Sequence, residues 1–350
     1  MGRPPSFRDI LGYFKDKASI TKATLLSKPD SSSPHLAVLR ATTHDPATPP
    51  EDKHLDRLLS LGHGSRLTAA ACIEALMDRL HTTRNSSVAL KCLISIHHVI
   101  SNGSFILQDQ LSVYPSSGGR NYLNLSNFRD ESNPVAWQLS LWVRWYARVL
   151  EQMLYASRVL GTFLSQTAGG ATGDETLEAL SNGDLVKEID ALVGVVEEIG
   201  KVPEYAYFQE NRLAGEVVRL VGDESILIQK EILGRVKETR ERLGCLSFGD
   251  SVELVCVLKR LEDCKQRVLF LCSVEEKRKL VGGDVLLSLV REMKEKIGMV
   301  GEIRGEGRAV LKGRGRGSES ARLFERVVRT GDSVCFPSAR IETRVLSRLG

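Results

Sequence analysis

Apolar residues recur at three- and four-residue spacing along most of the chain, and this period restricts the fold more than any other feature. It predicts helices at the following segments: 69–80, 87–100, 136–164, 185–199, 210–221, 224–243, 250–274 and 283–298. Gly, Asn or Pro residues separate them, for example at Asn102-Gly103 and Gly222-Asp223. Alternating patterns typical of strands are nearly absent. We therefore expect an all-α solenoid of about ten helices, in which short turns make successive helices antiparallel.

Composition and motifs exclude several classes of protein. The 350 residues are 42% hydrophobic and carry a net charge of +4, which is enough for a buried core and too little charge to require nucleic acid. Neither a bilayer-spanning apolar run nor a secretory signal is visible, so we expect a soluble intracellular protein. The seven cysteines form no CxxC pair. Because no catalytic motif or metal-ligand spacing is found either, we expect neither an enzyme nor a cofactor or metal.

The composition changes near residue 300. Residues 301–317 read GEIRGEGRAVLKGRGRG, and residues 301–350 hold eleven basic and six acidic side chains. We therefore expect a helical domain at 1–298 and a mostly flexible basic tail at 299–350, with short helices at most.

The N-terminal segment combines an apolar stripe with basic residues. Four apolar residues follow helical spacing beside two lysines: Phe7, Ile10, Leu11 and Phe14, with Lys15 and Lys17. Such a helix can lie in a membrane interface, with lysines near anionic lipid. It can equally pack its stripe on the next helix, and the sequence leaves both interpretations open.

The segment from Arg40 to His54, RATTHDPATPPEDKH, joins two helix-compatible segments. A corner of this kind can gather a guanidinium, an ammonium and imidazoles, which donate charge-assisted hydrogen bonds to phosphate oxygens. The candidate ligands are Arg40, His44, Lys53 and His54. A solvated polar loop is the simpler alternative.

At these residues the sequence resembles the ANTH-domain clathrin assembly proteins. That family's phosphoinositide motif has a basic residue before Ala-Thr and, further along, a Pro-Lys-x-Lys-His cluster. Here Arg40-Ala41-Thr42-Thr43-His44 resembles the first part and Pro50-Glu51-Asp52-Lys53-His54 the second. Further similarities are KCLISIHH at 91–98, NLSNFRD at 124–130 and VRWYARVL at 143–150, so the resemblance is clearest over residues 7–165.

The resemblance implies a function and a set of partners. It implies an ANTH-like solenoid that binds phosphoinositide membranes at Arg40, His44, Lys53 and His54, and a peripheral adaptor for clathrin and adaptor proteins. It also implies vesicle-SNARE selection and a location on plasma-membrane coated pits, clathrin-coated vesicles and the Golgi. One position departs from the family, because Glu51 stands where the motif has lysine. A carboxylate there repels phosphate, so we expect weaker headgroup binding.

Other residues fit structural roles. We expect one histidine of His97-His98 and the three tryptophans (Trp137, Trp142 and Trp145) to fill helix contacts, a partner groove being the alternative for the tryptophans. Cys256, Cys264 and Cys272 are expected to share a buried face, and Ser or Asn of NLSNFRD to cap a helix.

Two other functions remain open. One is a protein-binding helical scaffold that never touches lipid. The other is RNA binding through GRGRG at 313–317, because arginines between glycines can follow a phosphate backbone.

Overall fold

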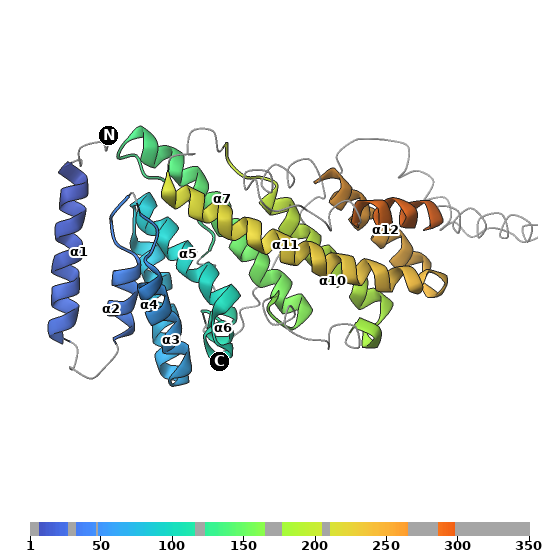
Figure 1. Cartoon of the computed structure of the whole chain (residues 1–350), viewed down its shortest axis with the longest axis horizontal. Helices are drawn as coiled ribbons and strands as arrows, with labels where there is room; N and C mark the ends of the chain where they lie inside the picture. The colour runs from blue at the N-terminus through green and yellow to red at the C-terminus, as the bar shows by residue number, and fades with distance from the viewer. Residues whose placement is uncertain are drawn as a thin grey trace, which may run out of the picture. The chain divides into compact units, whose positions relative to one another are not determined.

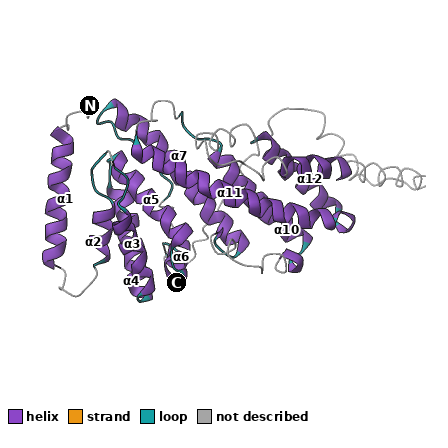
Figure 2. Cartoon of the chain, viewed as in Figure 1, coloured by secondary structure: helices purple, strands orange, loops and turns teal. Residues whose placement is uncertain are grey.

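The computed structural model describes residues 7–26, 33–46, 48–115, 123–164, 177–204, 211–264 and 286–297. Within these residues every regular element is helical and no strand occurs, as predicted (Figures 1 and 2). The elements are α1 (Phe7–Leu26), α2 (Pro34–Ala41), α3 (Asp52–Ser60), η1 (Leu61–His63), α4 (Arg66–Thr82), α5 (Ser86–Asn102), α6 (Phe105–Ser112), α7 (Pro134–Leu160), α10 (Asn182–Ile199), α11 (Arg212–Glu241), η3 (Leu243–Cys245) and α12 (Phe248–Asp263). Residues 286–297 are also helical. All described residues belong to one compact unit, Met1–Gly298, and the expected basic tail lies outside them.

Polar residues at the ends of the apolar segments fix where many helices begin. A side-chain oxygen accepts a hydrogen bond from a backbone N–H of the first turn at Ser65, Asn85, Asn133, Ser181, Asn211 and Ser247. These N-caps satisfy backbone donors that have no partner within the helix, and each contributes about 1 kcal/mol. At the other end of α7, Gly161 adopts φ 72°, a left-handed conformation that favours glycine.

The predicted break at Gly222-Asp223 is wrong, because α11 runs unbroken through both residues. A glycine inside a helix costs about 1 kcal/mol relative to alanine. The apolar face on both sides of it outweighs that cost, since Val221 and Ile228 are fully buried. Arg219 adds local support by donating to Glu216 and Asp223 on the adjoining turns.

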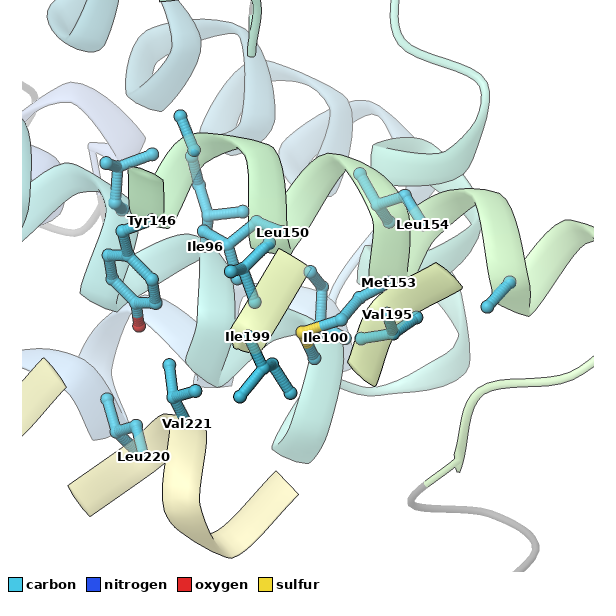
Figure 3. Close-up of a cluster of buried hydrophobic side chains, with 14 of the residues drawn as sticks. Ile96, Ile100, Tyr146, Leu150, Met153, Leu154, Val195, Ile199, Leu220 and Val221 are labelled. Atoms are coloured by element: carbon cyan, nitrogen blue, oxygen red, sulfur yellow. The ribbon is translucent and has the colours of Figure 1, made fainter. Parts of the chain in front are cut away.

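The core forms where α7 and α10 pack against one another and against the helices around them. α7 packs against α5 and α10, and α10 packs against α11 and α12. Figure 3 shows side chains from four of these helices meeting: Ile96 and Ile100 of α5, Tyr146, Leu150, Met153 and Leu154 of α7, Val195 and Ile199 of α10, and Leu220 and Val221 of α11. Each fully buried aliphatic side chain of this kind stabilises the fold by about 1.5–3 kcal/mol. None of the described helices has the length and apolar character needed to cross a bilayer.

Within this core, buried polar groups are joined to one another. His97 Nδ1 lies 2.8 Å from the Tyr146 hydroxyl oxygen, and its Nε2 lies 3.6 Å from Glu224 Oε2. Ser101 donates to the same carboxylate oxygen at 3.1 Å. The predicted core histidine is therefore His97, and its contacts link α5, α7 and α11.

The expected roles of the cysteines and of one tryptophan need correction. Cys256 is exposed, Cys264 is half-buried and Cys272 lies outside the described residues. Eight residues exceed two helical turns by about 80°, so this spacing does not keep side chains on one face. Trp142 and Trp145 are buried as expected, whereas Trp137 is 45% exposed.

The NLSNFRD segment also holds neighbouring helices by a different residue from the one expected. Its aspartate, Asp130, accepts a hydrogen bond from the Ser86 backbone N–H at 2.8 Å, at the start of α5. The Asp130 backbone N–H in turn donates to Ser140 Oγ on α7 at 2.9 Å. The cap of α7 is Asn133, which lies beyond the motif.

Candidate functional site

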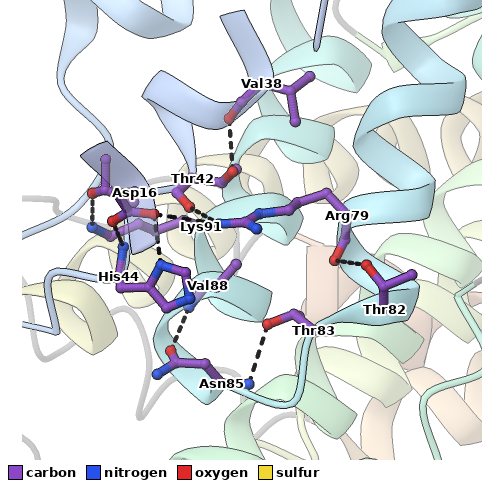
Figure 4. A network of polar contacts seen from close by, with 11 residues as sticks. Asp16, Val38, Thr42, His44, Arg79, Thr82, Thr83, Asn85, Val88 and Lys91 are labelled. Carbon is purple, nitrogen blue, oxygen red and sulfur yellow. Dashed lines mark hydrogen bonds and ion pairs between the residues drawn. The ribbon is translucent and has the colours of Figure 1, made fainter. Parts of the chain in front are cut away.

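The loop from Thr42 to Glu51 turns the chain from the end of α2 to the start of α3. Thr42 is fully buried, and both its backbone N–H and its hydroxyl donate to the Val38 carbonyl, at 3.0 and 2.6 Å. Arg79, in the last turn of α4, donates to the Thr42 carbonyl oxygen at 3.2 Å (Figure 4). The loop therefore begins from a fixed point against α4.

α1 is attached to this loop through Asp16 and His44. The His44 backbone N–H donates to Asp16 Oδ2 at 2.6 Å, and its ring Nδ1 lies 2.6 Å from Asp16 Oδ1 (Figure 4). Arg79 Nη2 lies 3.6 Å from the same oxygen. Gly12 allows the close approach, because a Cβ there would lie 2.7 Å from the His44 Cβ. One ring nitrogen of the predicted ligand His44 is thus engaged by a carboxylate.

The other three predicted ligands lie at the two ends of the same loop. Arg40 is exposed in the last turn of α2, Lys53 is exposed in the first turn of α3, and His54 is half-buried beside it. Burial lowers the pKa of His54, and the positive charges of Lys53 and Arg40 lower it further against the opposing effect of Glu51. An imidazole in this setting is neutral near pH 7 and can donate a hydrogen bond to an anion.

Glu51 lies within the same group of charges. Its carboxylate Oε2 is 2.5 Å from the Lys53 ammonium, and both side chains are largely exposed. The hydrogen bond and charge of Lys53 lower the pKa of Glu51, and His54 and Lys91 contribute less. An exposed pair of this kind contributes little to stability, but it occupies a cation that a phosphate would otherwise meet.

A lysine that the sequence did not single out as a ligand lies beneath the corner. Lys91 of α5 is 1% exposed, and its ammonium donates to Thr43 Oγ1 at 3.0 Å. Burial lowers the pKa of Lys91 to about 8, against the opposing charges of Asp45, Asp16 and Glu51. The sequence does contain a feature that marks this lysine as unusual. Lys91 lies in an apolar run with no acidic residue three or four positions away.

The structure describes the side chains of four of the six membrane-contact residues predicted on α1. Leu11 and Phe14 are 46% and 62% exposed, and Lys15 and Lys17 are exposed with them. Lys17 Nζ lies 4.7 Å from the ring centre of Tyr13, which is also exposed. The side chains of Phe7 and Ile10 lie outside the described ones, although both residues are in the helix. Burial against the next helix therefore does not apply to Leu11 and Phe14.

Comparison with known proteins matches this chain to the ANTH domain and to plant proteins named as clathrin assembly proteins. The sequence model of the ANTH domain matches residues 35–260. "Putative clathrin assembly protein At4g40080" of Arabidopsis thaliana is 49% identical over 337 residues, which cover 94% of this chain and 92% of the relative. "Putative clathrin assembly protein At5g10410" of the same plant is 32% identical over 73% of this chain and 77% of its own length. "Putative clathrin assembly protein At5g57200" is 33% identical over 74% of this chain, but over 44% of its own length.

Proposed function

We propose a function from the premise that this chain belongs to the ANTH domain family of clathrin assembly proteins. We propose that it is a peripheral membrane adaptor in clathrin-coat assembly. In this proposal the corner formed by Arg40, Lys53 and His54 binds a phosphoinositide headgroup. The ANTH match includes the whole corner, since it spans residues 35–260.

The observation that carries the proposal is that Arg40 ends α2 while Lys53 and His54 begin α3, at the two ends of one loop. These residues come from the end of one helix and the start of the next, and the loop between them is fixed by Thr42 and Arg79. A guanidinium, an ammonium and an imidazole held together can donate to several oxygens of one phosphorylated headgroup. Lys91 adds positive charge from below, through its contact with Thr43.

α1 supplies the second membrane contact. Leu11 and Phe14 present apolar surface, and the neighbouring Lys15 and Lys17 present charge that attracts anionic lipid. Asp16 holds this helix to the headgroup loop through His44. We therefore propose His44 as a link between the two contacts, with its remaining ring nitrogen available to a headgroup.

Glu51 sets the strength of the proposed interaction. Its carboxylate pairs with Lys53, so a headgroup phosphate must compete with it for the ammonium. We therefore propose binding that is weaker than a lysine at this position would give. Membership of the family supports three further parts of the proposal. They are selection of vesicle SNAREs, contacts with clathrin and other adaptors, and a location on coated pits, coated vesicles or the Golgi.

Flotation of the full chain with vesicles tests the proposal. Neutral phosphatidylcholine vesicles are compared with vesicles that also contain each phosphoinositide in turn, and with phosphatidylserine vesicles of equal charge. Each basic residue near an anionic surface contributes about 1 kcal/mol, so Arg40→Glu with Lys53→Glu is expected to weaken binding by at least about tenfold. Lys237→Glu with Lys259→Glu is the matched control, because it makes the same charge change at exposed positions of α11 and α12.

The outcomes separate the three functions. Loss of flotation in the first variant and retention in the control supports the headgroup corner. Equal flotation of both variants contradicts the corner, and no flotation of the unaltered chain favours a scaffold that does not bind lipid. Displacement of the chain from vesicles by RNA at moderate salt would instead favour the basic tail as the binding element.

A further inference from the structure

A groove on α7 lies outside the proposed headgroup corner and has no part in that function. One wall is α7 between Gln138 and Arg148, and the other is the chain that follows α10, residues 201–204. The groove is open to solvent and has a volume of about 610 Å³. We call this feature the α7 groove.

Two buried tryptophans of α7 lie directly beneath the α7 groove. The rings of Trp142 and Trp145 meet edge to face, with centres 5.5 Å apart, and the Trp145 indole N–H donates to the Glu198 carbonyl at 2.8 Å. Leu141, which lines the groove, is 39% exposed, and Trp137 lies one turn before it on the same helix face. Exposed leucine and tryptophan beside a concave surface are typical of sites that receive an apolar side chain.

The edge of the α7 groove carries arginines that point to an acidic partner. Arg144, which lines the groove, and Arg129, in the loop before α7, both donate from Nη1 to the Phe128 carbonyl oxygen, each at 2.8 Å. Burial lowers the pKa of Arg144, and the like charges of Arg129 and Arg148 lower it further. Among the described residues, the ion pairs of this region place no carboxylate within 4 Å of Arg129 or Arg144. Arg129 Nη1 also donates to the Ser126 carbonyl oxygen at 3.1 Å, and the other nitrogens of the two guanidiniums keep donors for an external carboxylate.

The acidic residues near the α7 groove restrict the kind of ligand. Glu198 already pairs with Lys201 at 2.5 Å and lies 3.5 Å from Arg148, and Glu204 lines the groove. A ligand with several phosphates would meet these two carboxylates, and Glu131 lies in the hollow that Arg129 lines. A single carboxylate placed between Arg129 and Arg144 meets less repulsion. The hollow shape also suits a protruding side chain better than the flat surface of a bilayer.

We propose that the α7 groove binds a short acidic segment of a partner protein. A bulky apolar side chain of that segment enters over Trp142 and Trp145, and a neighbouring Asp or Glu pairs with Arg129 and Arg144. The arrangement is complementary in both shape and charge, because the hollow with its exposed Leu141 and the paired guanidiniums lie side by side on α7 and the loop before it. This extends the proposed function from membrane attachment to the recruitment of a protein at a separate surface.

The full chain offers a direct optical test. All three tryptophans of the sequence lie in α7, so ligand binding in the groove changes the intrinsic fluorescence. A displayed library of random twelve-residue peptides is selected on the full chain, and the recovered peptides are titrated while tryptophan emission is recorded. The expected peptides combine acidic residues with Leu, Phe or Trp and shift the emission on binding.

Variants decide whether those peptides use the groove. Arg129→Glu with Arg144→Glu is expected to weaken binding at least tenfold, and Leu141→Ser several-fold. Arg158→Glu, at the other end of α7, makes the same kind of charge change and should leave binding unaltered. The Leu141 side chain has no hydrogen-bonding group, so Leu141→Ser tests the site even if the double arginine variant is destabilised.

Three outcomes overturn the proposal. The first is recovery of no binding peptide, or of peptides without acidic residues. The second is binding that neither the arginine variant nor Leu141→Ser weakens. The third is a shift of tryptophan emission with phosphatidylserine vesicles that depends on Arg129 and Arg144, which would assign the surface to the membrane.

Discussion

Charged groups serve different purposes in the α5–α7–α10–α11 core and at the corner between α2 and α3. In the core, Arg235 donates to Glu188 at 2.7 Å with both residues buried, so each charge has its partner inside the protein. At the corner, Arg40 and Lys53 face solvent and Lys53 meets only an exposed carboxylate. The difference indicates that core charges hold the helices in register, and in our proposal the exposed corner charges meet an external anion.

The largest effect is expected from a variant that breaks the buried ion pair between Arg235 and Glu188. Arg235→Ala leaves the buried carboxylate of Glu188 without its closest cation, and loss of one partner of a buried pair costs about 3–5 kcal/mol. We expect a marked fall in the free energy of unfolding, measured by urea denaturation followed by circular dichroism. Replacing both partners, with Arg235→Met and Glu188→Leu, should recover most of the lost free energy of unfolding. A variant as stable as the unaltered chain would mean that the pair does not hold α10 to α11.

The next effect concerns the apolar contact of α1. Leu11→Ser with Phe14→Ser removes two exposed side chains, so we expect at least about tenfold weaker vesicle binding and an unchanged melting temperature. Phe105→Ser with Phe248→Ser is the matched control, since those side chains are 73% and 71% exposed on other helices. A large fall in melting temperature in the α1 variant would assign the stripe to packing.

A gain of function tests the role of Glu51. Glu51→Lys releases Lys53 and adds a cation, so we expect about tenfold tighter binding to phosphoinositide vesicles. Glu241→Lys makes the same charge change at an exposed position near the end of α11 and should give no gain. Equal affinity of Glu51→Lys and the unaltered chain would contradict the placement of Glu51 at the headgroup.

The smallest effect is a pH dependence that arises from Lys91. Because its pKa is lowered to about 8, the folded chain loses this proton as the pH rises from 7 to 9, while phosphoinositide phosphates stay ionised. We expect vesicle binding to weaken about two- to threefold over this range in the unaltered chain and less in Lys91→Met. Both chains keep their α-amino group, which titrates in the same range. Equal slopes in the two chains would exclude Lys91 from the site.

We expect the lowered pKa of Lys91 to make vesicle binding fall as the pH rises, but to make the stability of the fold rise. Between pH 8 and the ordinary value of 10.5, the unfolded chain binds the proton that the folded chain has lost. The contribution of Lys91 to the free energy of unfolding therefore rises with pH in that interval. Lys91→Met should remove this rise, which denaturant titration at a series of pH values can measure.

Helical spacing predicted most of the fold because burial of one apolar face decides where a helix forms. It failed at Gly222, where a local cost of about 1 kcal/mol is small beside the burial of the surrounding face. It also failed at Cys256, because an eight-residue spacing drifts around the helix. The first failure came from applying a local rule where packing decides, and the second from treating eight residues as two whole helical turns.

For the site, the sequence predicted that Arg40, Lys53 and His54 would gather, because they flank one short loop. It could not predict that Asp16 would engage His44, since these residues meet only when α1 packs on the loop. Nor did it place Lys91 under Thr43, because that contact depends on how α5 lies against the loop. Local sequence thus predicts which side chains a turn brings together, but not which distant residues complete the site.

Hydrogen–deuterium exchange of the full chain, with and without phosphoinositide vesicles, tests the central claim most directly. We predict slower exchange on vesicles in two segments, the corner at 40–54 and α1 at Phe7–Leu26. Exchange in α10 and α11 should stay unchanged. Protection that leaves out residues 40–54 and appears in other parts of the chain would contradict the account.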